Sequence, residues 1–246
     1  MVYKVVDKEK FVELIKSSPH WRVLIRPVSF NPNLISKLPE LWQIMEACSV
    51  YLRGWTFPMV DNRIAKRING NDWIGANITS RSDREHWRFY QSGQFIDINE
   101  FRENSYPEYL NEIKNRPYTE IPNDFKPSGF LDVTLTLYRV TEIFEFAARL
   151  ANKGLFKSGI KISIELNGIK DHFLATLDPH RFFTGFYPAT SNKLGEPRQY
   201  TSQELIANSS RLALETVVWF FNRFSWMDVP TTALEETQRK LLERRL

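Results

Sequence analysis

Hydrophobic and polar residues alternate along several short stretches in the first half of the chain, and this alternation predicts β-strands. Trp21, Val23 and Ile25 alternate with two arginines and a leucine, as expected for a strand with one buried face. The same reasoning predicts strands over residues 50–55, 64–68, 73–79, 85–90 and 94–101, the last two forming a hairpin around Ser92-Gly93. One helix is expected after Asp7, a good N-cap residue, and another near Pro39.

Helical periodicity dominates the second half of the chain. Apolar residues recur every three or four positions over residues 131–153 and 202–224, which predicts two long amphipathic helices. A capping box formed by Thr201 and Glu204 marks the start of the second helix. A shorter charged amphipathic helix is predicted over residues 233–246.

A second hairpin is predicted between the two long helices. Residues 160–166 alternate strictly between apolar and polar side chains, and Asn167-Gly168 is a strong turn signal. The chain is therefore expected to return over residues 172–177 as the partner strand. Residues 184–200 are polar and contain Gly and Pro, so they are interpreted as a loop.

These elements together predict an α+β fold. We expect a mixed or mainly antiparallel sheet covered by the long helices 131–153 and 202–224, with an amphipathic helix at the C-terminus. The strand-rich first half would lack a covering layer without the later helices, which favours one domain over residues 1–230 despite the long connection at 104–129. Residues 231–246 are then a helical extension.

Composition adds a cellular setting to this fold. Hydrophobic residues make up 42% and charged residues 25% of the chain, which is typical of globular proteins. The single cysteine, Cys48, lies in an apolar pattern and excludes an intrachain disulfide, so a reducing cytoplasm is expected. The first residues are charged rather than hydrophobic, and no apolar run has the length needed to cross a bilayer. No membrane partner is expected.

Positive charge is concentrated between Arg53 and Arg88. This segment has seven basic and four acidic residues, so it holds three of the chain's net four positive charges. Trp55, Trp73 and Trp87 are interleaved with the arginines. Guanidinium planes and aromatic rings together can bind nucleobases or phosphates. The rings can equally belong to the core with arginine stems covering them, and the sequence leaves both interpretations open.

The hairpin from Glu85 to Phe95 carries the densest set of candidate binding residues. On a strand, Trp87, Phe89 and Gln91 would face one way, and His86, Arg88 and Tyr90 the other. With residues from neighbouring segments, the candidate ligand-binding set is Arg26, Arg53, Trp55, Trp73, Trp87, Arg88, Tyr90 and Gln91.

Candidate catalytic residues are fewer. The chain contains no glycine-rich phosphate loop, no zinc-ligand spacing and no nucleophile elbow, so neither a cofactor nor a metal is expected. An enzyme would have to combine His86 and Arg88 with Glu142 and Glu145 in one pocket. Residues 178–181, Asp-Pro-His-Arg, follow the last predicted strand and are more simply interpreted as a turn.

Four motifs resemble a bacterial domain of uncharacterised activity that occurs with Schlafen-type AlbA DNA-binding modules. They are Ile25-Arg26-Pro27, Leu52-Arg53-Gly54-Trp55, the run from Trp87 to Phe95, and the run from Val140 to Leu150. The resemblance covers the chain from about Trp21 to Trp226, and the AlbA-type module itself is absent from it. It implies a bacterial, cytoplasmic protein with a role in DNA-linked stress or antiviral defence.

Two functional hypotheses follow. The leading one is a non-enzymatic binding or accessory module that recognises a nucleic acid, a nucleotide or a protein through the Arg/Trp segment. The alternative is an enzyme, a hydrolase or nuclease with a His/Arg/Glu pocket. A protein partner or a homodimer contact through the C-terminal helix is a further expectation, because Leu234, Leu241 and Leu242 form an apolar strip there.

Overall fold

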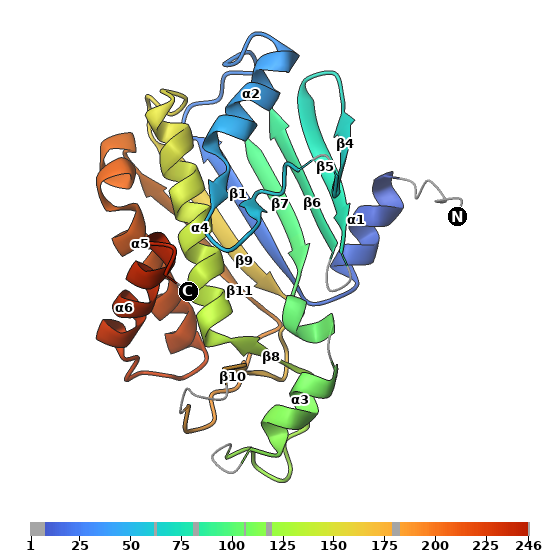
Figure 1. The fold of residues 1–246 in the computed structure, drawn as a ribbon, viewed down its shortest axis with the longest axis vertical. Coiled ribbons are helices and arrows are strands. Elements are labelled where there is room, and N and C mark those ends of the chain that lie inside the picture. The colour runs from blue at the N-terminus through green and yellow to red at the C-terminus, as the bar shows by residue number, and fades with distance from the viewer. Residues whose placement is uncertain are drawn as a thin grey trace.

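A seven-stranded antiparallel sheet forms the centre of the molecule (Figure 1). The computed structural model describes residues 8–61, 63–80, 84–105, 107–116, 120–178 and 183–245. The strands lie in the order β11-β9-β1-β7-β6-β5-β4. Their bounds are β1 His20–Pro27, β4 Ala65–Asn69, β5 Trp73–Thr79, β6 Arg84–Tyr90, β7 Phe95–Glu100, β9 Ile160–Asn167 and β11 Lys193–Tyr200.

Helices and short elements surround this sheet. The helices are α1 Lys8–Lys16, α2 Leu38–Cys48, α3 Pro107–Lys114, α4 Val133–Asn152, α5 Ser202–Arg223 and α6 Thr231–Leu242, with a 3-10 turn, η1, at Arg102–Ser105. Two minor pairs complete the fold, β2 Val50–Tyr51 with β3 Thr56–Phe57, and β8 Gly129–Asp132 with β10 His172–Ala175. Predominantly antiparallel strands and long helices confirm the predicted α+β class.

One face of the sheet, which we call the inner face, packs on the helices. Val23, Ile25, Trp87, Phe95 and Ile164 point to this face and are at most 3% exposed. Helix α4 runs along this side of the sheet with α2 at one end and α5 beside it (Figure 1). Alternation along each strand therefore buries one set of side chains, as the sequence predicts.

The opposite face, the outer face, is covered differently. Helix α1 packs on it through Phe11 and Ile15, which contact Ile98 of β7. Many outer-face side chains of β1, β5, β9 and β11 are half-buried or exposed. Within the described ranges, no helix has both the length and the apolar character needed to span a membrane.

The C-terminal helix α6 packs on its own chain. Leu234 and Leu241 are buried, and the Gln238 side-chain amide donates hydrogen bonds to Thr141 Oγ1 at 3.0 Å and Ser210 O at 2.9 Å. These contacts attach α6 to α4 and α5. Leu234 and Leu241 are therefore used within the chain, whereas Leu242 is half-buried, and a protein partner or homodimer contact through this helix stays a prediction.

Two local predictions around β9 are wrong. Residues 172–177 do not return as its hairpin partner, because β1 and β11 already occupy both edges of β9, and β10 instead pairs in parallel with β8. Residues 193–200 form the edge strand β11 rather than a loop. Pro197 and Gly195 obscure this strand in the sequence, since proline is tolerated in sheets mainly at edges, where no partner needs its N–H.

Candidate functional site

The sheet separates the predicted site residues into two groups. Paired residues on antiparallel strands share a face, and the register places Arg26, Trp73, Arg88, Tyr90 and His86 on the outer face. The inner-side group is Arg53, Trp55, Trp87, Gln91, Glu142 and Glu145. The predicted facing of the 85–91 strand is therefore correct, but the eight candidate ligand-binding residues cannot form one surface.

Trp87 and Gln91 serve the interior. The Trp87 ring is fully buried, packs edge-on against Trp42 with centroids 5.6 Å apart, and donates from Nε1 to Met59 O at 2.8 Å. Gln91 donates from Nε2 to Ile35 O at 2.9 Å. The indole N–H of Trp87 thus has its hydrogen-bond partner inside the protein, as expected for a core residue.

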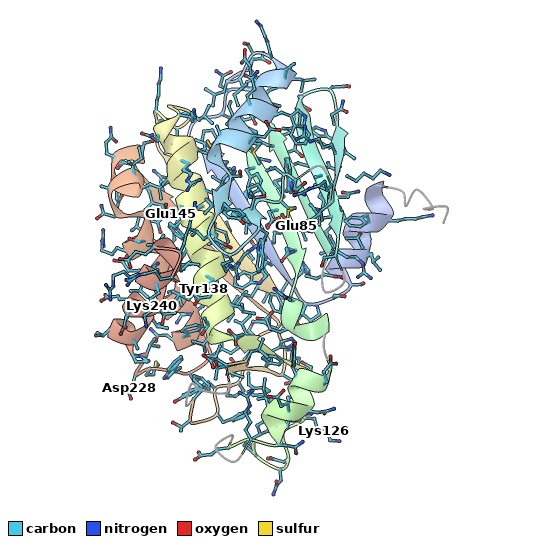
Figure 2. All side chains as sticks on the ribbon, viewed as in Figure 1. Glu85, Lys126, Tyr138, Glu145, Asp228 and Lys240 are labelled. Atoms are coloured by element: carbon cyan, nitrogen blue, oxygen red, sulfur yellow. The ribbon has the colours of Figure 1, made fainter. Side chains whose placement is uncertain are left out.

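Arg53 and Glu142 form a buried ion pair. Arg53 donates from Nε to Glu142 Oε1 at 2.9 Å and from Nη2 to Oε2 at 2.5 Å, and the two side chains are 9% and 0% exposed. The guanidinium also lies over the rings of Trp55 and Tyr138, at 4.9 and 5.6 Å from their centroids. Figure 2 shows Tyr138 and Glu145 on α4, with Glu85 in the neighbouring sheet.

The proposed catalytic set does not converge. Glu142 is fixed by Arg53, and Glu145 accepts a hydrogen bond from Ser209 Oγ at 2.5 Å. His86 and Arg88 lie across the sheet on the outer face. An enzyme built on these four residues is therefore not supported by the geometry. Of residues 178–181, only Asp178 lies among the described residues, where its N–H donates to Thr176 Oγ1 at 3.2 Å.

His86 is held as a neutral imidazole. It is 3% exposed, its Nδ1 lies 2.6 Å from Asn77 Oδ1, and its Nε2 accepts from Arg88 Nε at 3.1 Å. Burial, and then the neighbouring Arg88 charge, lower the pKa of His86 to about 4. Both ring nitrogens are occupied, so His86 orients Arg88 rather than acting as a base.

This low pKa predicts a pH dependence of stability. Between pH 6.5 and 4 the unfolded chain binds a proton at His86 that the folded chain does not, so stability is complete above 6.5 and falls as the pH drops towards 4. The loss amounts to roughly 3 kcal/mol. Urea unfolding of wild type and His86→Gln across this range should show a difference that changes with pH. A constant difference would contradict the neutral imidazole.

The outer-face group belongs to a surface that we call the outer platform. It consists of Leu24, Arg26, Trp73, Arg88, Tyr90, Ile96 and Lys161. Arg26 and Lys161 lie directly opposite each other on β1 and β9. Neither forms an ion pair within the described part of the chain. Like charges in directly opposed positions are destabilising. Stability of the fold therefore does not explain why two cations are paired here.

The strands give the outer face of the sheet a strongly basic character. The register gives it seven cations and two carboxylates among the described residues: Arg22, Arg26, Lys66, Arg84, Arg88, Lys161 and Lys193 against Glu100 and Glu165. Both carboxylates are already paired, Glu165 with Arg22 and Lys193, and Glu100 with Arg84. The surplus of five exceeds the net charge of the complete chain, +4.

An aromatic pair lies beside these charges. The Trp73 and Tyr90 rings are 6.4 Å apart, and the Arg88 guanidinium lies 4.3 Å from the Trp73 centroid. A side chain at Gly70 would collide with the Trp73 ring, since its Cβ would lie 2.1 Å from Nε1. Gly70 therefore leaves room for this indole beside the Arg88 guanidinium on strands β5 and β6.

A cleft on the inner side was not predicted. It has a volume of about 390 Å³ and lies between the ends of β5–β7, the 53–64 segment and α4. Its lining includes Trp21, Trp55, Glu85, Arg102 and Glu103. The cleft is lined by residues from five separate segments of the chain, so no local sequence motif predicts it. A smaller cavity of about 240 Å³ adjoins it through Arg102, Glu103 and Leu135.

Glu103 lies between the two cavities. Its Oε1 accepts from the Asp132 N–H at 3.1 Å, while Asp132 accepts from the Leu135 and Leu177 N–H groups at 2.6 and 2.5 Å. Burial, and then the negative charge of Asp132, raise the pKa of Glu103 to about 7. The Glu103 carboxyl is thus poised to exchange a proton near neutral pH.

Two further findings concern ligands and relatives. No group of three or more His, Cys, Asp or Glu side chains in the described ranges is arranged to hold a metal ion. No family model matches the chain, and the comparisons with curated proteins and with solved structures gave no match.

Proposed function

We propose that the protein is a non-enzymatic binding module that recognises single-stranded nucleic acid on its outer platform. The observation that carries this proposal is the directly opposed pair of Arg26 and Lys161. A phosphate bound between the two cations would screen their repulsion and form a charge-assisted hydrogen bond with each of them. The pair would then favour binding although it disfavours folding.

The aromatic residues favour a single strand over a duplex. Unstacked bases can lie on exposed aromatic rings of a sheet, whereas the bases of a duplex are already stacked on each other. Trp73 and Tyr90 are half-buried and lie three and two strands from Arg26, which gives separations of about 14 and 10 Å. The outer platform thus offers a stacking site and a phosphate site on one flat surface.

The biological setting is a separate proposal. A role in a bacterial, cytoplasmic, DNA-linked stress or antiviral defence system rests on the resemblance of four sequence motifs to a domain associated with AlbA-type modules. The basic outer platform is compatible with such a setting because nucleic acid would be the shared partner. Salt-dependent binding would support recognition of nucleic acid, but it would not test the role in stress or antiviral defence.

Fluorescence anisotropy with a labelled 20-nucleotide oligothymidylate tests the proposal. If Arg26, Lys161 and Arg88 each neutralise a phosphate, affinity should fall roughly 20-fold between about 50 and 200 mM salt. A duplex of matched length should bind more weakly than the single strand. Absence of binding at low salt, or binding that salt does not change, would contradict the proposal.

A further inference from the structure

One row of side chains crosses the outer face from the edge strand β11 to β5. Its members occupy opposed positions on neighbouring strands, so the row runs perpendicular to the strands. All of these side chains are half-buried or exposed. In order along the row, which we call the transverse row, they are Gln199, Lys161, Arg26, Gln94, Tyr90 and Trp73.

Gln94 connects the cationic and aromatic halves of the transverse row. Its carbonyl oxygen accepts from the Tyr90 N–H at 2.9 Å, and the β1–β7 register continued by one position places it beside Arg26. The Gln94 side-chain amide makes no hydrogen bond within the described residues, whereas the Gln91 amide donates to Ile35 O at 2.9 Å. A nucleotide between the two halves would therefore meet an amide whose donors and acceptor are available.

A nucleic-acid strand that ran along β9 instead would meet a carboxylate. Glu165 lies on the same face as Lys161 and four residues farther along β9, a distance of about 13 Å. Glu165 pairs with Arg22 at 3.0 Å and with Lys193 at 3.1 Å. A phosphate at this position would have to displace the carboxylate from both cations, so the free positive charge on β9 is at the end of the strand that carries Lys161.

Helix α1 covers the outer face in the same direction on β6 and β7. Phe11 and Ile15 of α1 pack against Ile98 of β7, and α1 also contacts β6. His86, four residues from Tyr90 on β6, is only 3% exposed. The accessible part of these two strands is therefore the end that carries the transverse row.

The length of the transverse row limits how many nucleotides it can hold. Neighbouring strands lie about 4.8 Å apart, so the four spacings from Lys161 on β9 to Trp73 on β5 amount to about 19 Å. A stacked strand advances about 3.4 Å per nucleotide. The row therefore corresponds to at most about six nucleotides, and to fewer where the bases are unstacked.

We propose that the bound strand follows the transverse row, perpendicular to the β-strands, and that the outer platform takes a short unpaired segment of at most about six nucleotides. Phosphates lie at Lys161 and Arg26, and bases stack at Tyr90 and Trp73. This proposal rests on the proposed function and adds to it the path and the length of the bound segment. A single-stranded end or a short gap in a duplex is long enough to fill such a site.

Competition by unlabelled oligothymidylates of increasing length tests the size of the site. At about 50 mM salt a dinucleotide should bind at least about fivefold more weakly than a hexanucleotide, because it cannot reach both the cations and the aromatic rings. A dodecanucleotide should gain over the hexanucleotide no more than the number of registers that the site has on it. A steeper rise beyond the hexanucleotide would contradict the transverse path, whereas absence of binding at every length would contradict the proposed function itself.

Two variants that each gain one lysine test the direction of the bound strand. Gln199→Lys adds a cation at the β11 end of the transverse row, opposite Lys161. With the dodecanucleotide, its log–log salt slope should become more negative by about 0.7. Thr79→Lys adds a cation opposite Arg84, about 20 Å along β5 from Trp73 and beyond the Debye length of about 10 Å at 0.1 M salt. It should keep the wild-type slope.

The two substitutions are matched in every respect except their place on the sheet. Each puts a lysine opposite an existing cation at an exposed strand position, so both change the net charge equally and the stability similarly. Equal changes of slope in the two variants, or no change in Gln199→Lys while the wild type binds, would contradict the transverse path.

Discussion

Replacement of Arg53 by alanine is expected to lower the free energy of unfolding by about 3–5 kcal/mol. Glu142, which is completely buried in α4, would then be left as an uncompensated carboxylate in the core. The two hydrogen bonds of 2.9 and 2.5 Å would be lost, together with the contact of the guanidinium with the Trp55 ring. Urea denaturation followed by circular dichroism measures the effect.

Matched variants separate burial from charge in this experiment. Arg63→Ala removes the same side chain from an ion pair with Asp61 in which Arg63 is 87% exposed, so its effect should be much smaller than that of Arg53→Ala. The double variant Arg53→Ala/Glu142→Gln should recover part of the loss, because no charge remains buried. Similar losses in Arg53→Ala and Arg63→Ala would show that the buried pair has no special role.

Replacement of Trp73 by alanine is expected to weaken oligothymidylate binding about 5- to 150-fold, the effect of losing stacking with one base. The indole lies on the outer platform against Arg88, so its removal also frees the guanidinium from its present position. Anisotropy at constant salt measures the change. This prediction rests on the proposed function and concerns its aromatic part.

Tyr51 provides the control for Trp73. It is also an aromatic residue beside a guanidinium, with Arg244 5.6 Å from its ring centroid, and it is 48% exposed. Tyr51 lies on β2, outside the seven-stranded sheet. Tyr51→Ala should change affinity by less than about twofold. Equal losses in the two variants would mean that binding is not localised at the outer platform.

Local patterns in the sequence predicted most of the sheet because alternation directly reports which face is buried. The 85–90 strand illustrates this, since its period of two placed His86, Arg88 and Tyr90 together on one face. Edge strand β11 was missed for a physical reason: an edge has fewer constraints, so Gly195 and Pro197 could occupy it without disrupting a ladder on both sides.

The site depended on information that a local pattern does not contain. Arg53 and Glu142 are 89 positions apart and form one ion pair, while Arg53 and Arg88, both in the Arg/Trp segment, lie on opposite sides of the sheet. Arginine and tryptophan residues that alternate along the 53–88 segment are therefore not all neighbours in the folded protein. The cleft around Glu103 combines segments from across the sequence, and only the arrangement of strands and α4 brings them together.

The salt dependence of oligonucleotide binding, compared between two variants that each lose two cations, tests the central proposal most directly. Arg26→Gln/Lys161→Gln removes two cations from the outer platform, whereas Arg211→Gln/Lys240→Gln removes two from exposed ion pairs on α5 and α6 (Lys240 is labelled in Figure 2). The outer-platform variant should bind more weakly, and its log–log salt slope should become less negative by about 1.4. The helix variant should keep the wild-type slope. Equal changes in both variants, or none in the outer-platform variant, would contradict nucleic-acid binding on this face.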